Sequence, residues 1–378
     1  MLPQGRLASL DLGRMVACLA VVVFHANIDA LHLEPSVMIW GQYGVEFFMV
    51  LSGYVLSRPY FEGAGGADRR LRLWPYLRRR FARIAPPYYV VVFLGAALAL
   101  AGQGGAHGPI PRAELPWHVA THLAFIHTWF PETHLSLVSV LWSLGLEAQY
   151  YLLFPILLVA MRRYPPPLIF AVAFFICLAF RYAVIAVAPD AQGHLMNGIF
   201  LARFTEFTFG VTFAALLGRA REKADAFLLL GAVALLAACW LTFAWFFPGP
   251  VWRELGVQGV IFFLFALLRL VGPANVTALP LRGLRFLGEA SYSTYLVHTL
   301  AGKASLKVAD RLGIGIGIGV GAGAPAGGAY LRFALYIVAA HAAGVLFFWL
   351  IERPFTKWAA ARLHVTPPGA GASRLVRT

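Results

Sequence analysis

Long apolar runs separated by short basic loops constrain this chain more than any other feature of its sequence. An α-helix crosses the ~30 Å hydrocarbon core of a bilayer with about 20 apolar residues. Backbone groups inside hydrocarbon must find their hydrogen bonds within the protein, which favours helices. Of the 378 residues, 60% are hydrophobic and 13% are charged, about half the charged share of an ordinary soluble domain. The sequence therefore predicts an all-α integral membrane protein.

Ten runs are long and apolar enough to be membrane spans. They cover residues 12–32, 41–58, 84–102, 138–160, 167–188, 198–218, 226–247, 252–271, 286–306 and 331–351. Lys and Arg gather in the loops of one side, with eight arginines from Arg58 to Arg83. Such a bias marks the cytoplasmic side, so we expect about ten transmembrane helices in the cell (inner) membrane, with both termini cytoplasmic.

The chain is expected to form one transmembrane domain, residues 8–358, followed by a disordered cytoplasmic tail, residues 359–378. Residues 312–331 form an uncharged run, but their glycines make a poor helix, so we expect an extracytoplasmic connection. The net charge of +14 could indicate nucleic acid. The basic residues lie between apolar runs, however, which favours contact with anionic membrane lipids and argues against nucleic acid.

The first span carries three ionisable side chains, Asp11, Arg14 and His25. Arg14 and His25 are eleven residues apart, which places them on one helix face about 16 Å apart. Asp11 precedes Arg14 by three residues and is close enough to pair with it. An ionisable group deep in a bilayer is costly unless it faces protein or water, so His25 is a candidate functional residue. The alternative is a histidine satisfied between helices.

The second and third spans add polar residues at both ends. Glu46 is a carboxylate at the outer end of the second span, and Ser52 with Gly53 makes a small notch within it. Such a notch admits either a substrate chain or a closely packed helix. Arg80 and Arg83 share one helix face at the cytoplasmic start of the third span. This pair could hold phosphates by bidentate hydrogen bonds or contact lipid headgroups.

The fourth span begins with a polar cluster formed by Trp142, Ser143 and Glu147. A carboxylate in the bilayer is a candidate functional group. Glu147 could orient His25, pair with Arg14 or position an acceptor hydroxyl.

Polar residues also occur in later spans. Arg203 and Glu206 are three residues apart, so they can neutralise each other, which favours a structural role. The ninth predicted span places Glu289, Tyr292 and His298 in one helix.

The loop at residues 103–137 contains five histidines. His118 and His122 have the i,i+4 spacing of half a metal site, but no H-E-x-x-H pattern accompanies them. We therefore expect no metal and no permanently bound cofactor. An interfacial or re-entrant helix anchored by Trp117 and Trp129 fits this loop better.

Six motifs occur in order along the chain. They are LDLGR with His25 eleven residues after its arginine, GVEFFMVLSGY, RFARIAPP, WSLGLEAQYYLLFP, LGEASYSTYLVH and ERPF. This series resembles acyltransferase family 3, integral membrane acyltransferases that include sugar O-acetyltransferases acting on bacterial surface polysaccharides. The resemblance runs from residue 10 to about residue 355. It departs at LDLGR, where LDGLR is usual, and at Ala148, where the family usually has a second glutamate.

The resemblance implies an O-acyltransferase that uses cytoplasmic acyl-CoA, in the simplest case acetyl-CoA, as its donor substrate. The acceptor would be a hydroxyl of an extracytoplasmic carbohydrate or glycolipid. Arg80 and Arg83 would hold the CoA phosphates, and His25 would act as general base or carry the acyl group. The same intramembrane charges allow one alternative, a secondary transporter or flippase.

The sequence thus predicts a set of catalytic residues and a set of substrate-binding residues. The expected catalytic residues are His25, Arg14, Glu147 and Asp11. The expected substrate-binding residues are Arg80, Arg83, Ser52, Gly53, Trp142, Ser143, Glu46, Tyr292 and His298.

Overall fold

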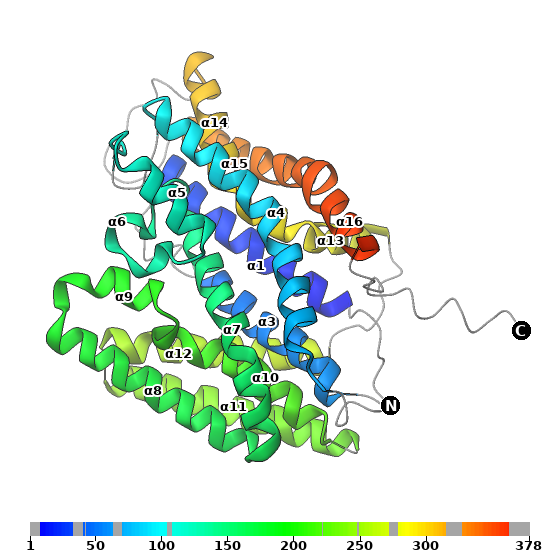
Figure 1. The fold of residues 1–378 in the computed structure, drawn as a ribbon. Coiled ribbons are helices and arrows are strands. Elements are labelled where there is room, and N and C mark those ends of the chain that lie inside the picture. The colour runs from blue at the N-terminus through cyan, green and yellow to red at the C-terminus, as the bar shows by residue number, and fades with distance from the viewer. Residues whose placement is uncertain are drawn as a thin grey trace, which may run out of the picture.

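The computed structural model describes residues 8–32, 41, 43–62, 70–103, 108–220, 222–247, 249–271, 279–314 and 327–362. Within these residues all regular structure is helical, which confirms the predicted all-α fold. The long helices are α1 (Ala8–Ala26), α3 (Gly44–Phe61), α4 (Leu73–Leu100), α7 (Trp142–Arg163), α8 (Pro166–Val187), α10 (Phe204–Leu217), α11 (Lys223–Phe246), α12 (Pro250–Leu270), α14 (Ser291–Arg311) and α15 (Gly327–Phe347). They pack side by side as a bundle (Figure 1).

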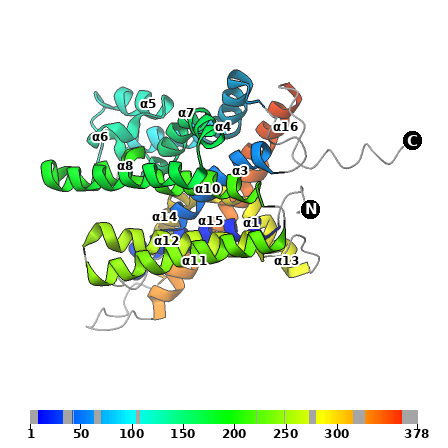
Figure 2. The same ribbon diagram turned by 90° about the horizontal axis from the view of Figure 1, so that it is seen from below.

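Shorter helical segments connect the long ones. They are η1 (Asn27–Leu31), α5 (Leu115–Leu123), η3 (His127–Trp129), α6 (Pro131–His134), η4 (Ser139–Leu141), η5 (Pro189–Ala191), α9 (Gln192–Gly198), η6 (Phe200–Arg203), α13 (Leu279–Glu289), η7 (Phe348–Glu352) and α16 (Arg353–Arg362). Both views place α5 and α6 at one end of the bundle and α13 with α16 at the other (Figures 1 and 2). We refer to these as the α5 end and the α13 end.

Eight helical segments of the described chain are long and apolar enough to cross a membrane. The other two predicted spans correspond to α3 and α14, which have 18 and 21 residues but are not among these eight. Two of their polar side chains face the protein interior: Glu46 is 1% exposed and His298 is 0% exposed. Burial against neighbouring helices is what makes such groups tolerable in a membrane. The chain is therefore a multi-pass membrane protein, while ten crossings and cytoplasmic termini stay predictions.

Two predicted helix boundaries are wrong. Helix α4 begins at Leu73 rather than near residue 84, because an amphipathic helix continues beyond the apolar run that marks a span. Arg80 and Arg83 consequently lie inside α4 rather than at its start. The predicted ninth span is two helices, since α13 ends at Glu289 and α14 begins at Ser291.

The break at Glu289 has a packing cause. Helix α13 meets α1 so closely that a Cβ on Gly288 would lie 1.9 Å from the backbone oxygen of Asp11. This contact fixes the direction of α13, and α14 then turns into the bundle. The sequence had predicted Glu289, Tyr292 and His298 in one helix. Glu289 instead ends α13, whereas Tyr292 and His298 belong to α14.

The predicted connections and tail are described only in part. The loop at 103–137 contains α5, and Trp117 and Trp129 are 43% and 52% exposed, as expected for an interfacial helix. Residues 315–326 of the glycine-rich segment lie outside the described residues. Helix α16 extends to Arg362, four residues into the predicted tail, and residues 363–378 also lie outside the description.

Helices α3 and α10 approach each other at glycines. A Cβ on Gly53 would lie 2.2 Å from the carbonyl oxygen of Phe207, and one on Gly210 would lie 2.0 Å from that of Val50. Small residues permit this close backbone approach between membrane helices. Gly53, predicted to bind substrate, is thus a packing residue, the alternative that the sequence left open.

Candidate active site

A cavity of about 140 Å³ lies among α1, α3, α4, α7, α13, α14 and η7. The charged side chains that line it are Arg14, Arg80, Arg83, Glu147, Glu289 and Glu352. Apolar residues of α3 and α7, such as Met49 and Leu144, complete its walls. Five of the nine predicted substrate-binding residues line it, namely Arg80, Arg83, Ser52, Ser143 and Tyr292. Two predicted catalytic residues, Arg14 and Glu147, line it as well.

The arginines of α4 lie at one side of this cavity. Arg80 is partly buried and its guanidinium carbon lies 5.9 Å from the ring centroid of Tyr151. Its Nε atom is buried and has no hydrogen-bond partner among the residues that the structure describes. Arg83 lies three residues further on and is exposed. A buried donor without a partner costs about 1–3 kcal/mol, so Arg80 is suited to an anionic ligand that supplies the acceptor.

Glu147 joins α3 to α7 within the cavity. Its carboxylate accepts hydrogen bonds from Ser52 Oγ at 3.1 Å and from Tyr151 OH at 2.5 Å. The hydrogen bonds that the structure gives Glu147 thus do not go to Arg14 or to the histidine that it was expected to orient. Arg14 instead donates to Asp11 at 2.7 Å, which confirms the pair predicted from their spacing.

Tyr151, Tyr295 and Glu352 are among the lining residues that the predicted site did not include. Tyr151 follows Glu147 by one helical turn, and Tyr295 follows Tyr292 by three residues, so helical spacing alone could have found both. Glu352 belongs to the ERPF motif and accepts a 2.5 Å hydrogen bond from Ser293 Oγ. Its position at the cavity depends on how α15 packs against α14, which the local sequence does not reveal.

His25 and His298 form a pair behind one wall of the cavity. Their ring centroids are 4.9 Å apart, and Nε2 of His298 lies 3.3 Å from Nδ1 of His25. Phe48 and Tyr295 line the cavity on this side, whereas the two histidines do not. The Tyr295 ring lies 6.3 Å from that of Phe48 and 5.7 Å from that of His298. Tyr295 thus connects the wall of the cavity to the histidine pair.

The hydroxyl of Tyr295 connects this wall to α7. It lies 2.7 Å from Ser143 Oγ and donates to the carbonyl of Val140 at 3.0 Å. A Ser143 hydroxyl bound in this way is held at the end of the cavity nearest the histidine pair. His298, predicted to bind substrate, is fully buried and contacts His25 instead.

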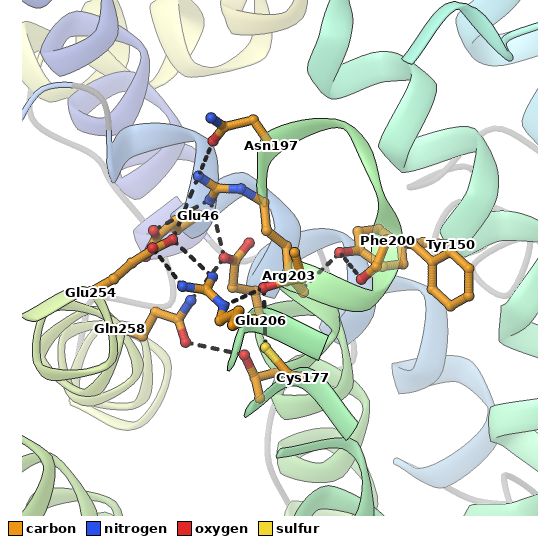
Figure 3. Close-up of polar contacts among 12 residues, drawn as sticks. Glu46, Tyr150, Cys177, Asn197, Phe200, Arg203, Glu206, Glu254 and Gln258 are labelled. Carbon is orange, nitrogen blue, oxygen red and sulfur yellow. Dashed lines mark hydrogen bonds and ion pairs between the residues drawn. The ribbon is translucent and has the colours of Figure 1, made fainter. Parts of the chain in front are cut away.

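A second cluster of charged residues lies outside the cavity (Figure 3). Arg203 NH1 lies 3.4 Å from Glu46 and 3.2 Å from Glu206, which confirms the predicted Arg203–Glu206 pair. Arg181 binds both oxygens of Glu254 at 2.5 and 2.9 Å. All these side chains except Glu254 are at most 11% exposed. The cluster joins helices α3, α8, α10 and α12.

Two predicted substrate-binding residues belong to this cluster rather than to the cavity. Glu46 is held by Arg203, and the guanidinium carbon of Arg203 lies 5.3 Å from the ring centroid of Trp142. One oxygen each of Glu46, Glu206 and Glu254 lie within 4.8 Å of one another, a spacing that could suit a metal ion. Arg203 contacts all three carboxylates at 3.2–3.7 Å and supplies positive charge in their midst.

The histidines of the loop form a buried group at the α5 end. His122 stacks on His127 with ring centroids 4.0 Å apart. His118 Nδ1 lies 2.8 Å from Ser136 Oγ, and His122 Nδ1 lies 2.7 Å from the carbonyl of His118. Burial lowers the pKa of His122 to about 4. Burial, reinforced by the neighbouring His122, holds the pKa of His127 well below its ordinary value, so both rings are neutral at pH 7.

The bundle and its cavity define a class of protein: a helical membrane protein with ionisable groups gathered around one cavity. Residues 7–353 match the family model for the acyltransferase domain. The chain therefore belongs to this family of acyltransferases and is an enzyme of acyl transfer, as the motifs had predicted.

Three relatives illustrate the range of the family. The chain is 27% identical to acyltransferase MdmB of Streptomyces mycarofaciens, over 92% of this chain and 91% of that protein. It is 28% identical to exopolysaccharide production protein ExoZ of Rhizobium meliloti, over 88% and 94%. It is 26% identical to the peptidoglycan O-acetyltransferase OatA of Listeria monocytogenes, over 41% of this chain but only 25% of that protein. No solved structure matches the chain.

Proposed function

We propose that this protein transfers an acyl group, in the simplest case acetyl, from acyl-CoA to a hydroxyl of a carbohydrate or glycolipid across the membrane. The acyl-transfer chemistry follows from the family, which also favours an enzyme over a transporter. Acyl-CoA as the donor is supported by one observation: Arg14, Arg80 and Arg83 line the same cavity. The carbohydrate acceptor is supported by two relatives named for exopolysaccharide and peptidoglycan.

The dimensions of the cavity suit the narrow part of acyl-CoA. At about 140 Å³ it is smaller than the 300–1,000 Å³ typical of sites that enclose a whole ligand. In our proposal the pantetheine arm enters between apolar residues such as Met49 and Leu144. The phosphates stay at the α13 side, where Arg80 and Arg83 bind them by charge-assisted hydrogen bonds. Arg14, held by Asp11, adds a third positive charge along the arm.

The chemical step is assigned to His25. It removes the proton of the acceptor hydroxyl through Nε2 as the hydroxyl oxygen attacks the thioester carbonyl. The new carbon–oxygen bond forms, the carbon–sulfur bond breaks, and the proton passes from His25 to the departing CoA thiolate. We assign Ser143 to the developing oxyanion, toward which its hydroxyl can rotate away from Tyr295. Tyr295, whose own proton goes to the carbonyl of Val140, positions Ser143 at the deep end of the cavity. Because the histidine pair does not line the cavity, a side chain of the cavity wall must move for the thioester to reach His25.

The proposed orientation follows the charges. Acyl-CoA is made in the cytoplasm, and the loops at the Arg80 side are rich in arginine, which is the cytoplasmic signature. We therefore place the protein in the cytoplasmic membrane with the α13 end inside. The histidine pair then lies toward the outer leaflet, where an acceptor on the far side can approach it.

The test is thiol release from acetyl-CoA by the purified protein in lipid vesicles. Wild type is compared with His25→Ala and Arg14→Ala, with and without a cell-envelope extract as acceptor. We expect release by wild type and a loss of at least 100-fold in His25→Ala, the scale of general-base catalysis. Full activity in folded His25→Ala protein would overturn the scheme.

A further inference from the structure

We propose that His298 is a positioning residue that fixes the tautomer of His25 and stabilises its protonated form. The proposal rests on the function above, in which His25 is the general base, and names the group that orients this base. It is carried by hydrogen-bond geometry around the two rings.

The tautomer of His298 is set by the backbone. Its Nδ1 lies 2.7 Å from the carbonyl oxygen of Tyr295. A carbonyl oxygen only accepts hydrogen bonds, so Nδ1 of His298 must carry the proton. A neutral imidazole has one ring proton, which leaves a lone pair on Nε2. That lone pair faces His25, because Nε2 lies 3.3 Å from Nδ1 of His25.

The tautomer of His25 follows from its two neighbours. Its Nδ1 lies 3.0 Å from the carbonyl oxygen of Val21 as well as 3.3 Å from Nε2 of His298. Both neighbours are acceptors, so Nδ1 of His25 carries the proton and shares it between them. The lone pair of neutral His25 is therefore on Nε2, which is the atom that a general base must present to a hydroxyl.

The larger effect of His298 arises when His25 takes up a proton. Imidazolium in apolar surroundings is costly unless a neighbour accepts from it. The lone pair of His298 is such an acceptor, and a hydrogen bond strengthens when its donor becomes charged. Because this charge appears only as the hydroxyl proton moves, the contact lowers the barrier of the chemical step and leaves donor binding unchanged.

Two other titratable residues near the pair, Asp29 and His341, do not accept the hydrogen bond of His25 Nδ1. Asp29 follows His25 by one helical turn and could act as an orienting carboxylate. Its Oδ1 lies 3.9 Å from Nζ of Lys303, whereas the contacts of His25 Nδ1 are with Val21 and His298. His341 of α15 also faces the pair, and its Nδ1 lies 2.9 Å from the carbonyl of Ile337. Asp29 therefore offers a control position close to His25.

The test compares His298→Gln with His298→Met. The two side chains have similar size and shape, but only the Gln amide oxygen can accept a hydrogen bond from Nδ1 of His25. We expect the Gln variant to keep kcat within about 10-fold of wild type and the Met variant to lose about 10²–10³-fold. KM for acetyl-CoA should stay constant in both, because His298 does not line the cavity. Asp29→Asn should change kcat less than about 3-fold.

A purely structural role for His298 predicts a different pattern. Both variants would then lose thermal stability and active protein together, with no difference in kcat per folded molecule. Equal kcat in folded Gln and Met variants overturns the inference. If His25→Ala protein stays active, the proposed function itself fails. If His25→Ala is inactive and His298→Met matches wild type, only the present inference fails.

A measurement on the wild-type protein does not depend on the folding of any variant. Nitrogen NMR of ¹⁵N-histidine-labelled protein in bilayers distinguishes the two ring tautomers, and His25→Ala assigns the signals of the pair. We expect both His25 and His298 to be protonated at Nδ1. An Nε2-protonated form of either ring overturns the proposal.

Discussion

At the scale of single residues, Arg80 carries the most direct mark of a ligand, a buried Nε atom without a partner among the described residues. If it binds a CoA phosphate, Arg80→Gln removes a charge-assisted hydrogen bond worth about 1.5–3 kcal/mol. KM for acetyl-CoA should then rise roughly 10- to 150-fold. KM for S-acetyl-pantetheine, which lacks phosphates, should stay unchanged. Steady-state thiol release with the two donors measures both values.

A matched control comes from the same helix. Arg79 is the neighbouring residue of α4 and does not line the cavity, so Arg79→Gln removes one charge from the same surface. We expect it to change KM for acetyl-CoA less than 3-fold, since surface charges are screened by salt. Equal effects of the two substitutions would point to general attraction by the basic surface rather than to a phosphate site.

At the scale of elements, the cluster of Figure 3 ties together helices that are distant in sequence. Arg181 of α8 donates to the carbonyl of Ala202 at 2.7 Å and binds Glu254 of α12 through two hydrogen bonds. Arg181→Met leaves the partly buried carboxylate of Glu254 with less compensation, at a cost below the ~3–5 kcal/mol of breaking a fully buried pair. We expect a clear fall in the thermal unfolding midpoint in detergent.

The double variant Arg181→Met/Glu254→Gln separates charge from packing. It removes the guanidinium and the carboxylate together, so little uncompensated charge remains. More than half of the lost stability should return, as measured by scanning fluorimetry of both proteins in the same detergent. A double variant less stable than Arg181→Met would contradict the assignment of this cluster to charge balance.

The short helices at the α5 end have their own pH dependence. Burial lowers the pKa of His122 from 6.5 to about 4, so folding favours the neutral ring. This contribution to stability is fully present above pH 6.5 and is lost as the pH falls toward 4. At pH 5 the free energy of unfolding is lower by about 2 kcal/mol than at high pH. The unfolding midpoint should therefore drop between pH 7 and pH 5.

His122→Phe supplies the control for this pH effect. Phe can keep the stacking on His127, whose ring lies 4.0 Å away, but it does not titrate. The variant should lose less stability than wild type over the same pH range, measured by thermal melts at pH 7, 6 and 5. Identical pH curves for the two proteins would show that this ring is not responsible.

At the scale of the whole molecule, polar side chains face the interior of the bundle, and the hydropathy of the sequence does not reveal which helices carry them. The two predicted spans that are not among the eight candidate membrane-spanning helices, α3 and α14, supply Ser52, Tyr292, Tyr295 and His298 to the cavity and its surroundings. More apolar helices such as α8 and α11 keep large hydrophobic side chains exposed on the outside. The fold thus shields a polar interior from lipid.

The sequence by itself determined the helical fold, the approximate position of the eight candidate membrane-spanning helices, and the pairs formed within one helical turn. Asp11 with Arg14 and Arg203 with Glu206 were predictable because a helix places such neighbours on one face. The motifs also predicted the family, and five of the nine residues expected to bind substrate line the cavity.

Only the tertiary structure decided which distant side chains meet. His25 and His298 are 273 residues apart, Glu147 and Ser52 are 95 apart, and Glu46 and Arg203 are 157 apart. Helical periodicity gives the face on which a residue lies, but not the helix that packs against that face. The partner depends on close backbone approaches such as those at glycines of α3 and α10, which are set by packing of the whole bundle.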